Sequence, residues 1–182
     1  MRGKRLLQTL RLYTILSSAK RTKYLKDNGI FGSIGDNCNI MNRKVPLYAK
    51  LIKLGNNVRI ASNVTFVTHD VTHTMLNAHP DFSGKRFSEK VGCIEIQDNV
   101  FVGAGTTILY GVRIGTNVIV GAGSLVNKDI PPNAVVGGVP AKIISTFEEY
   151  INKRIQEKAY PLQEKELGNE FSFLENSPAK KT

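Results

Sequence analysis

All three histidines of the chain, His69, His73 and His79, lie in one short stretch of the sequence. A neutral imidazole has an ordinary pKa near 6.5, so at neutral pH it can take a proton from a hydroxyl group and return it later. Imidazoles are also common zinc ligands, and two neighbouring histidines could share a metal ion. The stretch therefore predicts general-base catalysis or metal binding, depending on the fold that presents it.

A repeat of six residues follows the histidines. From residue 96 it reads IQDNVF, VGAGTT, ILYGVR, IGTNVI, VGAGSL, VNKDIP and PNAVVG. The first position is aliphatic until Pro132, the fifth is small or β-branched, and glycine often takes the second. Period six matches neither an α-helix nor a single strand; it indicates short strands that turn a corner every six residues, three to a triangular coil. We predict an all-β solenoid, with first and fifth residues inward, seven units in register, and glycines chosen for corner dihedrals.

Units of the same kind occur upstream, from residues 34 and 54. Cys38 takes an inward position, and the two cysteines, Cys38 and Cys93, are too few for a disulfide framework. Between residues 40 and 53 the register slips by two, which predicts a bulge or small loop. Residues 69–93 break the repeat, because its inward positions would hold residues unable to fill a core: Thr72, Ala78, Gly84 and Lys90. This segment is predicted to be an excursion loop.

The N-terminal segment, residues 1–30, carries eight Lys or Arg and one acid, a net charge of +7 out of +10 for the chain. Its apolar residues have helical spacing. We expect a helix packed across the open end of the solenoid, and peripheral attachment to an anionic membrane is the alternative. The basic residues lack the interleaved aromatics of a nucleic-acid module, so no nucleic-acid partner is expected. The apolar face comprises Leu6, Leu7, Leu10, Tyr13 and Leu16.

No stretch approaches the roughly 20 apolar residues of a membrane span, and the N-terminus lacks a signal-peptide core, which predicts a cytoplasmic location. Residues 31–144 form the predicted solenoid and residues 145–182 a C-terminal helix with a polar tail over 161–182. Two overlapping capping boxes, Ser145–Glu148 and Thr146–Glu149, predict that this helix covers about residues 147–159.

Three stretches together resemble the hexapeptide-repeat acyltransferase superfamily. They are Asn63–Asp70, which ends a coil on a histidine, the two VGAG units, and Val126–Asn133 leading to GGVPAK at 137–142. The likeness runs over about residues 34–144 and is greatest to the galactoside, maltose and nodulation-factor acetyltransferases and polysaccharide O-acetyltransferases. It implies a left-handed parallel β-helix, although parallel crossovers are otherwise almost always right-handed.

The resemblance also implies chemistry: a homotrimer that binds acetyl-CoA between neighbouring solenoids, with no metal expected. The position of His69 matches the general base of the family. Phe101 stands where sugar-acetylating relatives often carry tryptophan. Further residues are assigned to the acceptor (Asp70, His73 and Phe101) and to acetyl-CoA (Ala104 and Ala122 at the pantetheine arm, Asn127, Lys128 and Lys142 near its outer end).

The expected reaction is acetyl transfer to a hydroxyl group of a sugar or polysaccharide precursor. Amines, serine and drugs are acceptors elsewhere in the superfamily and are the nearest alternatives. A zinc enzyme like the γ-class carbonic anhydrases would use His69 and His73 as ligands, yet the coils after residue 93 carry no histidine. A non-catalytic scaffold is the remaining alternative. His79, beside Pro80, is expected at the surface.

Overall fold

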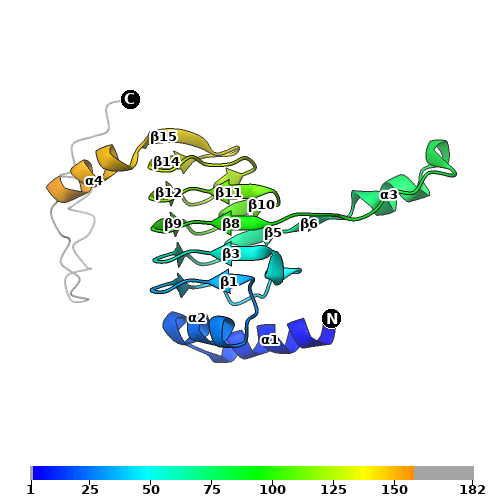
Figure 1. Ribbon diagram of the computed structural model, residues 1–182, viewed down its shortest axis with the longest axis horizontal. Coiled ribbons are helices and arrows are strands. Elements are labelled where there is room, and N and C mark those ends of the chain that lie inside the picture. The colour runs from blue at the N-terminus through cyan, green and yellow to red at the C-terminus, as the bar shows by residue number, and fades with distance from the viewer. Residues whose placement is uncertain (1, 158–182) are drawn as a thin grey trace, which may run out of the picture. The chain divides into compact units, whose positions relative to one another are not determined.

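A computed structural model describes residues 2–157. Its main body is a parallel β-helix, in which short strands stack coil upon coil (Figure 1). Each full coil contributes one strand to each of three sheets, so the coils enclose a triangular prism. The predicted solenoid is confirmed.

The first sheet contains β1 (Ser33–Ile34), β3 (Ile52–Leu54), β8 (Ile94–Ile96) and β11 (Val112–Ile114). The second contains β2 (Asn39–Ile40), β4 (Arg59–Ile60), β9 (Val100–Val102), β12 (Val118–Val120), β14 (Ala134–Gly137) and the antiparallel β15 (Lys142–Thr146). The third contains β5 (Thr65–Val67), β10 (Thr107–Leu109) and β13 (Leu125–Val126). The helices are α1 (Arg2–Thr14), α2 (Ser18–Asp27), α3 (Thr72–Ala78) and α4 (Phe147–Gln156), with 3-10 turns η1 (Ala49–Leu51) and η2 (Pro80–Phe82).

Inward residues of the repeat form three continuous columns in the core. Their first-position members are at most 8% exposed, and each lies on its equivalent in the next coil. Two polar fifth-position residues are buried as well, and both hydroxyls donate to the Gly121 carbonyl, Thr106 at 3.2 Å and Ser124 at 2.6 Å. The columns are Ile34, Leu54, Ile96 and Ile114; Ile40, Ile60, Val102 and Val120; and Phe66, Ile108 and Val126.

The expected register fails at the last predicted units. Ile130, not Pro132, bridges to Ile114, and Val136 pairs with Val120, a first-position residue. The coil is therefore two residues shorter than the repeat predicts, and Pro132 is exposed. Proline has no N–H to give to the ladder, whereas Ile130 N donates to the Arg113 carbonyl at 2.9 Å.

The physical reason for glycine at the second position differs from the one expected. Neither Gly103 nor Gly121 has a positive φ. A Cβ built on Gly103 would lie 2.4 Å from the backbone N of Ala122 in the next coil, whereas a Cβ on Gly121 would be 3.4 Å from its nearest neighbour, the Val136 carbonyl. Close approach between coils, not corner dihedrals, therefore requires glycine at position 103.

Asparagines supply the left-handed conformation at one corner. The side-chain amide of each donates to the side-chain carbonyl of the next at 2.9–3.0 Å, and all have φ between 52° and 60°. Asparagine tolerates this conformation better than other residues with a Cβ. The ladder consists of Asn37, Asn57, Asn99, Asn117 and Asn133.

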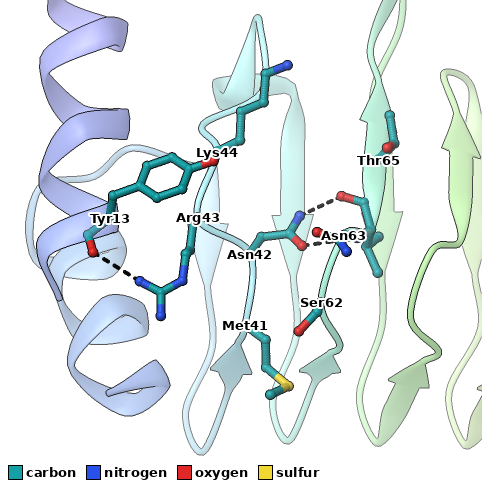
Figure 2. A pocket seen from close by; sticks show the side chains of 9 residues that line it. Tyr13, Met41, Asn42, Arg43, Lys44, Ser62, Asn63 and Thr65 are labelled. Atoms are coloured by element: carbon teal, nitrogen blue, oxygen red, sulfur yellow. Dashed lines mark hydrogen bonds between the residues drawn. The ribbon is translucent and has the colours of Figure 1, made fainter. Parts of the chain in front are cut away.

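Residues 41–51 replace the third-sheet strand of the first coil, which confirms the predicted slip of two residues. Cys38, just before this segment, is half-buried against the core, and its thiol contacts the Gly55 carbonyl at 3.1 Å. Asn42 fastens the segment to the next coil, because its amide exchanges two hydrogen bonds with the backbone of Val64 (Figure 2).

Helices α1 and α2 lie at the open end of the prism (Figure 1). Helix α1 packs by a different face from the one predicted. Leu12 is 1% exposed, whereas Leu6, Leu7 and Leu10 are 54–68% exposed. The expectation that these leucines cover the prism is wrong. The opposite side of α1 faces the prism, where Leu12 is buried and the Thr9 hydroxyl accepts from Val45 N. Tyr13 and Leu16 belong to the same predicted packing face and are also exposed, at 57% and 84%.

The excursion leaves the prism through an antiparallel pair of short strands, β6 (His69–Asp70) and β7 (Lys90–Val91), and carries α3 and η2 at its tip (Figure 1). One compact unit ends at Tyr150. Helix α4 begins at the second of the two capping boxes: Thr146 Oγ1 accepts from Glu149 N and Glu149 Oε2 from Thr146 N. The predicted end of this helix at 159 and the polar tail lie outside the described residues.

Candidate active site

His69 lies where the chain leaves the third sheet for the excursion. The preceding Thr68 is fully buried, and its hydroxyl donates to the Leu47 carbonyl at 2.6 Å. The Thr68 carbonyl in turn accepts from Gly92 N at 2.9 Å. Both flanking segments are thereby tied to the residue before His69, so the backbone of the histidine is fixed although the excursion beyond it projects away.

One ring nitrogen of His69 is enclosed. Its Nδ1 is buried and makes no hydrogen bond within residues 2–157, whereas Nε2 is not among the enclosed atoms. The ring of Tyr48 meets the imidazole edge to face, with centroids 5.5 Å apart and an angle of 86°. Nε2 is therefore the nitrogen that can meet a substrate, and Tyr48 limits rotation of the ring.

Tyr48 and Glu89 are site residues that the sequence analysis did not identify. The Tyr48 hydroxyl donates to Glu89 Oε2 at 2.9 Å, and this bond to a carboxylate raises the pKa of the tyrosine. Tyr48 comes from the segment that replaces the first third-sheet strand, whereas Glu89 comes from the returning arm of the excursion. Tyr48 contacts His69 and Glu89 contacts Tyr48, across segments far apart in the sequence, so no local motif marks them.

The carboxylate of Asp70 is used within the fold. It accepts from the Tyr110 hydroxyl at 2.6 Å and from the Thr72 hydroxyl and backbone N at 2.6 and 3.1 Å. These bonds, those from Thr72 first, lower the pKa of Asp70 to about 2. The ionised carboxylate bonds the first residue of α3 and, through Tyr110, joins the excursion to the prism. Its assignment to the acceptor stays a prediction.

Of the other two histidines, His73 shares the enclosed Nδ1 of His69, whereas His79 does not. His73, on the first turn of α3, is half-buried with an enclosed Nδ1 that has no partner among the described residues. His79 is exposed, and its Nδ1 accepts from Asp81 N in the turn at η2. The structure gives His79 a local capping contact and brings neither residue into contact with His69.

A cavity of about 760 Å³ borders the His69 corner. Its lining includes Tyr48, which contacts His69, and Val91, which pairs with His69 across β6 and β7. Basic side chains approach from α1 and from η1, and the wall between them is mainly apolar. The basic, apolar and acidic residues of this lining include Lys4, Arg5, Val45, Leu47, Lys50 and Glu89.

Ala104 and Ala122 lie at a different corner of the prism, between the second and third sheets. Gly123 N donates to the Ala104 carbonyl at 2.8 Å, so the two exposed alanines stack in adjacent coils. Lys142 is exposed at the start of β15, next to Ala141, whose N donates to Leu125 O in the third sheet. Small corner residues followed by a cation suit a long ligand that ends in phosphates.

Asn127 and Lys128 lie beside Ala141 and Ile143, the residues on either side of Lys142. They follow β13 and lie on the His69 side of the third sheet, two coils further along, beside a small cavity of about 90 Å³. Phe101 is 45% exposed on β9 of the second sheet, away from the strand that leads to His69. Within one chain, the predicted acceptor and cofactor residues are therefore spread over separate corners and faces.

Within residues 2–157, no three His, Cys, Asp or Glu side chains are grouped as a metal site requires. In the same range, no helix combines the length and the apolar character needed to cross a bilayer.

The family model described as bacterial transferase hexapeptide (six repeats) matches residues 94–128. A Staphylococcus aureus (strain COL) protein whose name provisionally describes an acetyltransferase is 42% identical over 154 residues, covering 75% of each chain. The galactoside O-acetyltransferase of Escherichia coli K12 is 44% identical over 100 residues, 54% of this chain and 45% of the relative. The chain thus spans about half the length of several curated relatives it matches.

Among solved structures, a galactoside acetyltransferase in complex with coenzyme A is 27% identical, with a TM-score of 0.57 and 88% of each chain covered. This likeness confirms the left-handed parallel β-helix.

Proposed function

The chain belongs to the hexapeptide-repeat transferase family, and on this ground we propose that it transfers the acetyl group of acetyl-CoA to a hydroxyl group of a sugar or glycan. The observation that carries the proposal is the fixed imidazole of His69. Its backbone is anchored through Thr68, Nδ1 is enclosed, Nε2 is not, and Tyr48, which contacts the ring, lines a neighbouring cavity.

His69 acts as the general base in this proposal. A hydroxyl group attacks a thioester only as it loses its proton, and Nε2 takes that proton while the new C–O bond forms. Bound acetyl-CoA supplies the activated acetyl group. The same imidazole then returns the proton to the departing thiolate, so no covalent enzyme intermediate is needed. Tyr48 keeps the ring in position, because edge contact and the bond to Glu89 restrict both residues.

The acetyl-CoA site is assigned to the alanine corner. Ala104 and Ala122 expose main chain there without bulky side chains, and Lys142 adds positive charge at its outer end. Gly103 supports this corner because it lets the two coils approach closely. The relative solved with coenzyme A supports a ligand of this class.

The acceptor is assigned to the cavity beside His69. Its volume of about 760 Å³ is ample for a sugar with an attached group. A sugar acceptor agrees with the names of the galactoside O-acetyltransferase relatives. Roles for Asp70, His73 and Phe101 at the acceptor, and a cytoplasmic location, stay predictions.

In a homotrimer with shared sites, residues from different corners of two neighbouring chains would form one active site. A ligand that follows Ala104 and Ala122 runs along a corner that His69 of the same chain does not occupy. A neighbouring chain can present its own His69 and Lys128 to that corner, and cyclic symmetry makes the three sites equivalent. An active species of one chain's mass, 20.1 kDa, in sedimentation equilibrium would contradict this arrangement.

The catalytic role is tested by steady-state release of CoA thiol from acetyl-CoA with a galactoside as acceptor. His69→Ala should lower kcat by about 10²-fold or more with the fold intact, because general-base assistance is lost. His79→Ala is the matched control and should stay near the wild-type rate, since His79 is exposed in the same excursion. Turnover by His69→Ala equal to that of the control would refute the assignment.

A further inference from the structure

The N-terminal end of the prism carries an apolar surface that the proposed reaction does not use. Leu6, Leu7 and Leu10 are 59%, 68% and 54% exposed on α1, and Leu16, just beyond the helix, is 84% exposed. Residues 6, 7 and 10 are neighbours on one helix face, which we call the leucine face. The opposite side of α1 packs on the prism through Leu12, so the leucine face is turned away from the fold.

This surface is surrounded by positive charge. Residues 1–26 contain eight Lys or Arg and no Asp or Glu. Arg11 is exposed on α1, and Lys20 is exposed on α2, which lies at the same end of the prism (Figure 1). Lys23 of α2 is exposed too but pairs with Asp27 at 2.9 Å. An apolar stripe with basic residues nearby is the pattern of helices that lie in the interface of an anionic membrane.

The attachment of α1 to the prism is firm enough to present this face. Arg43 donates to the Tyr13 carbonyl at 3.1 Å near the end of the helix (Figure 2). Arg21 donates to the Ile15 and Leu16 carbonyls, both at 2.7 Å. These bonds hold the helix by its C-terminal end, so the leucine face keeps its direction without any partner among the described residues.

We infer that α1 docks the protein on the surface of an anionic bilayer, with the leucine face in the acyl boundary and the basic residues at the lipid phosphates. Charge complementarity selects this occupant, because α1 carries basic residues and no acidic ones, so that anionic lipid attracts the helix whereas a second copy of the same helix repels it. The inference is independent of the proposed reaction, since it needs neither acetyl-CoA nor His69.

The test is co-sedimentation of the full-length protein with phosphatidylcholine–phosphatidylglycerol vesicles, with pure phosphatidylcholine vesicles alongside. Binding is expected to the anionic vesicles only, and to fall as salt rises. Leu7→Ser/Leu10→Ser should lower the partition constant at least about tenfold. Arg11→Gln/Lys20→Gln should lower it about twenty-five-fold, from about fivefold for each basic residue.

Two control variants match these changes elsewhere on the surface. Val71→Ser/Met75→Ser removes two apolar residues, 55% and 58% exposed in the excursion, and Lys53→Gln/Lys85→Gln removes two exposed lysines. Both should bind like the wild type. The inference is overturned if the leucine variant binds equally well, if neutral vesicles bind as strongly as anionic ones, or if the leucine variant lowers the oligomeric mass in sedimentation, which would show that another chain covers the face.

Discussion

Replacement of Gly103 by alanine should destabilise the protein, whereas the same replacement of Gly121 should not. Both glycines occupy the second position of a VGAG unit, and neither has a positive φ. The new Cβ at position 103 would lie 2.4 Å from Ala122 N and 2.7 Å from Ala122 Cα. Normal contact is about 3.5 Å, so the coils must separate by about 1 Å. This would stretch the 2.8 Å bond from Gly103 N to the Val120 carbonyl.

Overpacking of this kind costs about 2–3 kcal/mol, which for a chain of this length lowers Tm by roughly 4–12 °C. Gly121→Ala meets its nearest atom at 3.4 Å and removes freedom from the unfolded chain, so its Tm should change little or rise slightly. Thermal unfolding followed by far-UV circular dichroism at equal chain concentrations measures both. Because the coils at Gly103 carry the alanine corner, Gly103→Ala should also raise KM for acetyl-CoA. Equal Tm values for the two variants would refute the reasoning.

Three further changes test the site. Tyr48→Phe keeps the ring against His69 but loses the bond to Glu89, so kcat should fall several-fold with KM for acetyl-CoA unchanged; an unchanged kcat would remove Tyr48 from the site. Lys142→Ala should raise KM for acetyl-CoA with little change in kcat, the result of lost uniform binding, and a change confined to kcat would contradict its assignment. Asp70 has a pKa lowered to about 2, so its stabilising contribution is complete above its unfolded pKa near 3.9 and is lost as pH falls through about 2. The Tm difference between wild type and Asp70→Asn should therefore shrink between pH 5 and pH 2, and a constant difference would argue against these bonds.

The six-residue periodicity was sufficient to predict which residues are buried in the core, because each inward position repeats the same environment. Ile96, Val102 and Ile108 are buried as the six-residue spacing requires. The shortening before Ile130 could not be read from the spacing, since Ile130 and Pro132 are both compatible with an inward position until the partner strand is known.

Amphipathic spacing also predicted α1 but not its orientation. Periodicity identifies a face of Leu6 and Leu10 and says nothing of what covers it. The inward side is set instead by bonds such as that of Thr9 to Val45, which connect distant segments. Tyr48 reaches His69 for the same kind of reason, since their contact depends on which coils are neighbours.

Mass spectrometry of the products from labelled acetyl-CoA and a panel of sugars and amino sugars would decide the reaction. The wild-type protein is expected to yield O-acetylated sugar, and His69→Ala to yield at least about a hundredfold less under the same conditions. Exclusively N-acetylated products, or equal yields of the O-acetylated product from both proteins, would contradict hydroxyl acetylation with His69 as the general base.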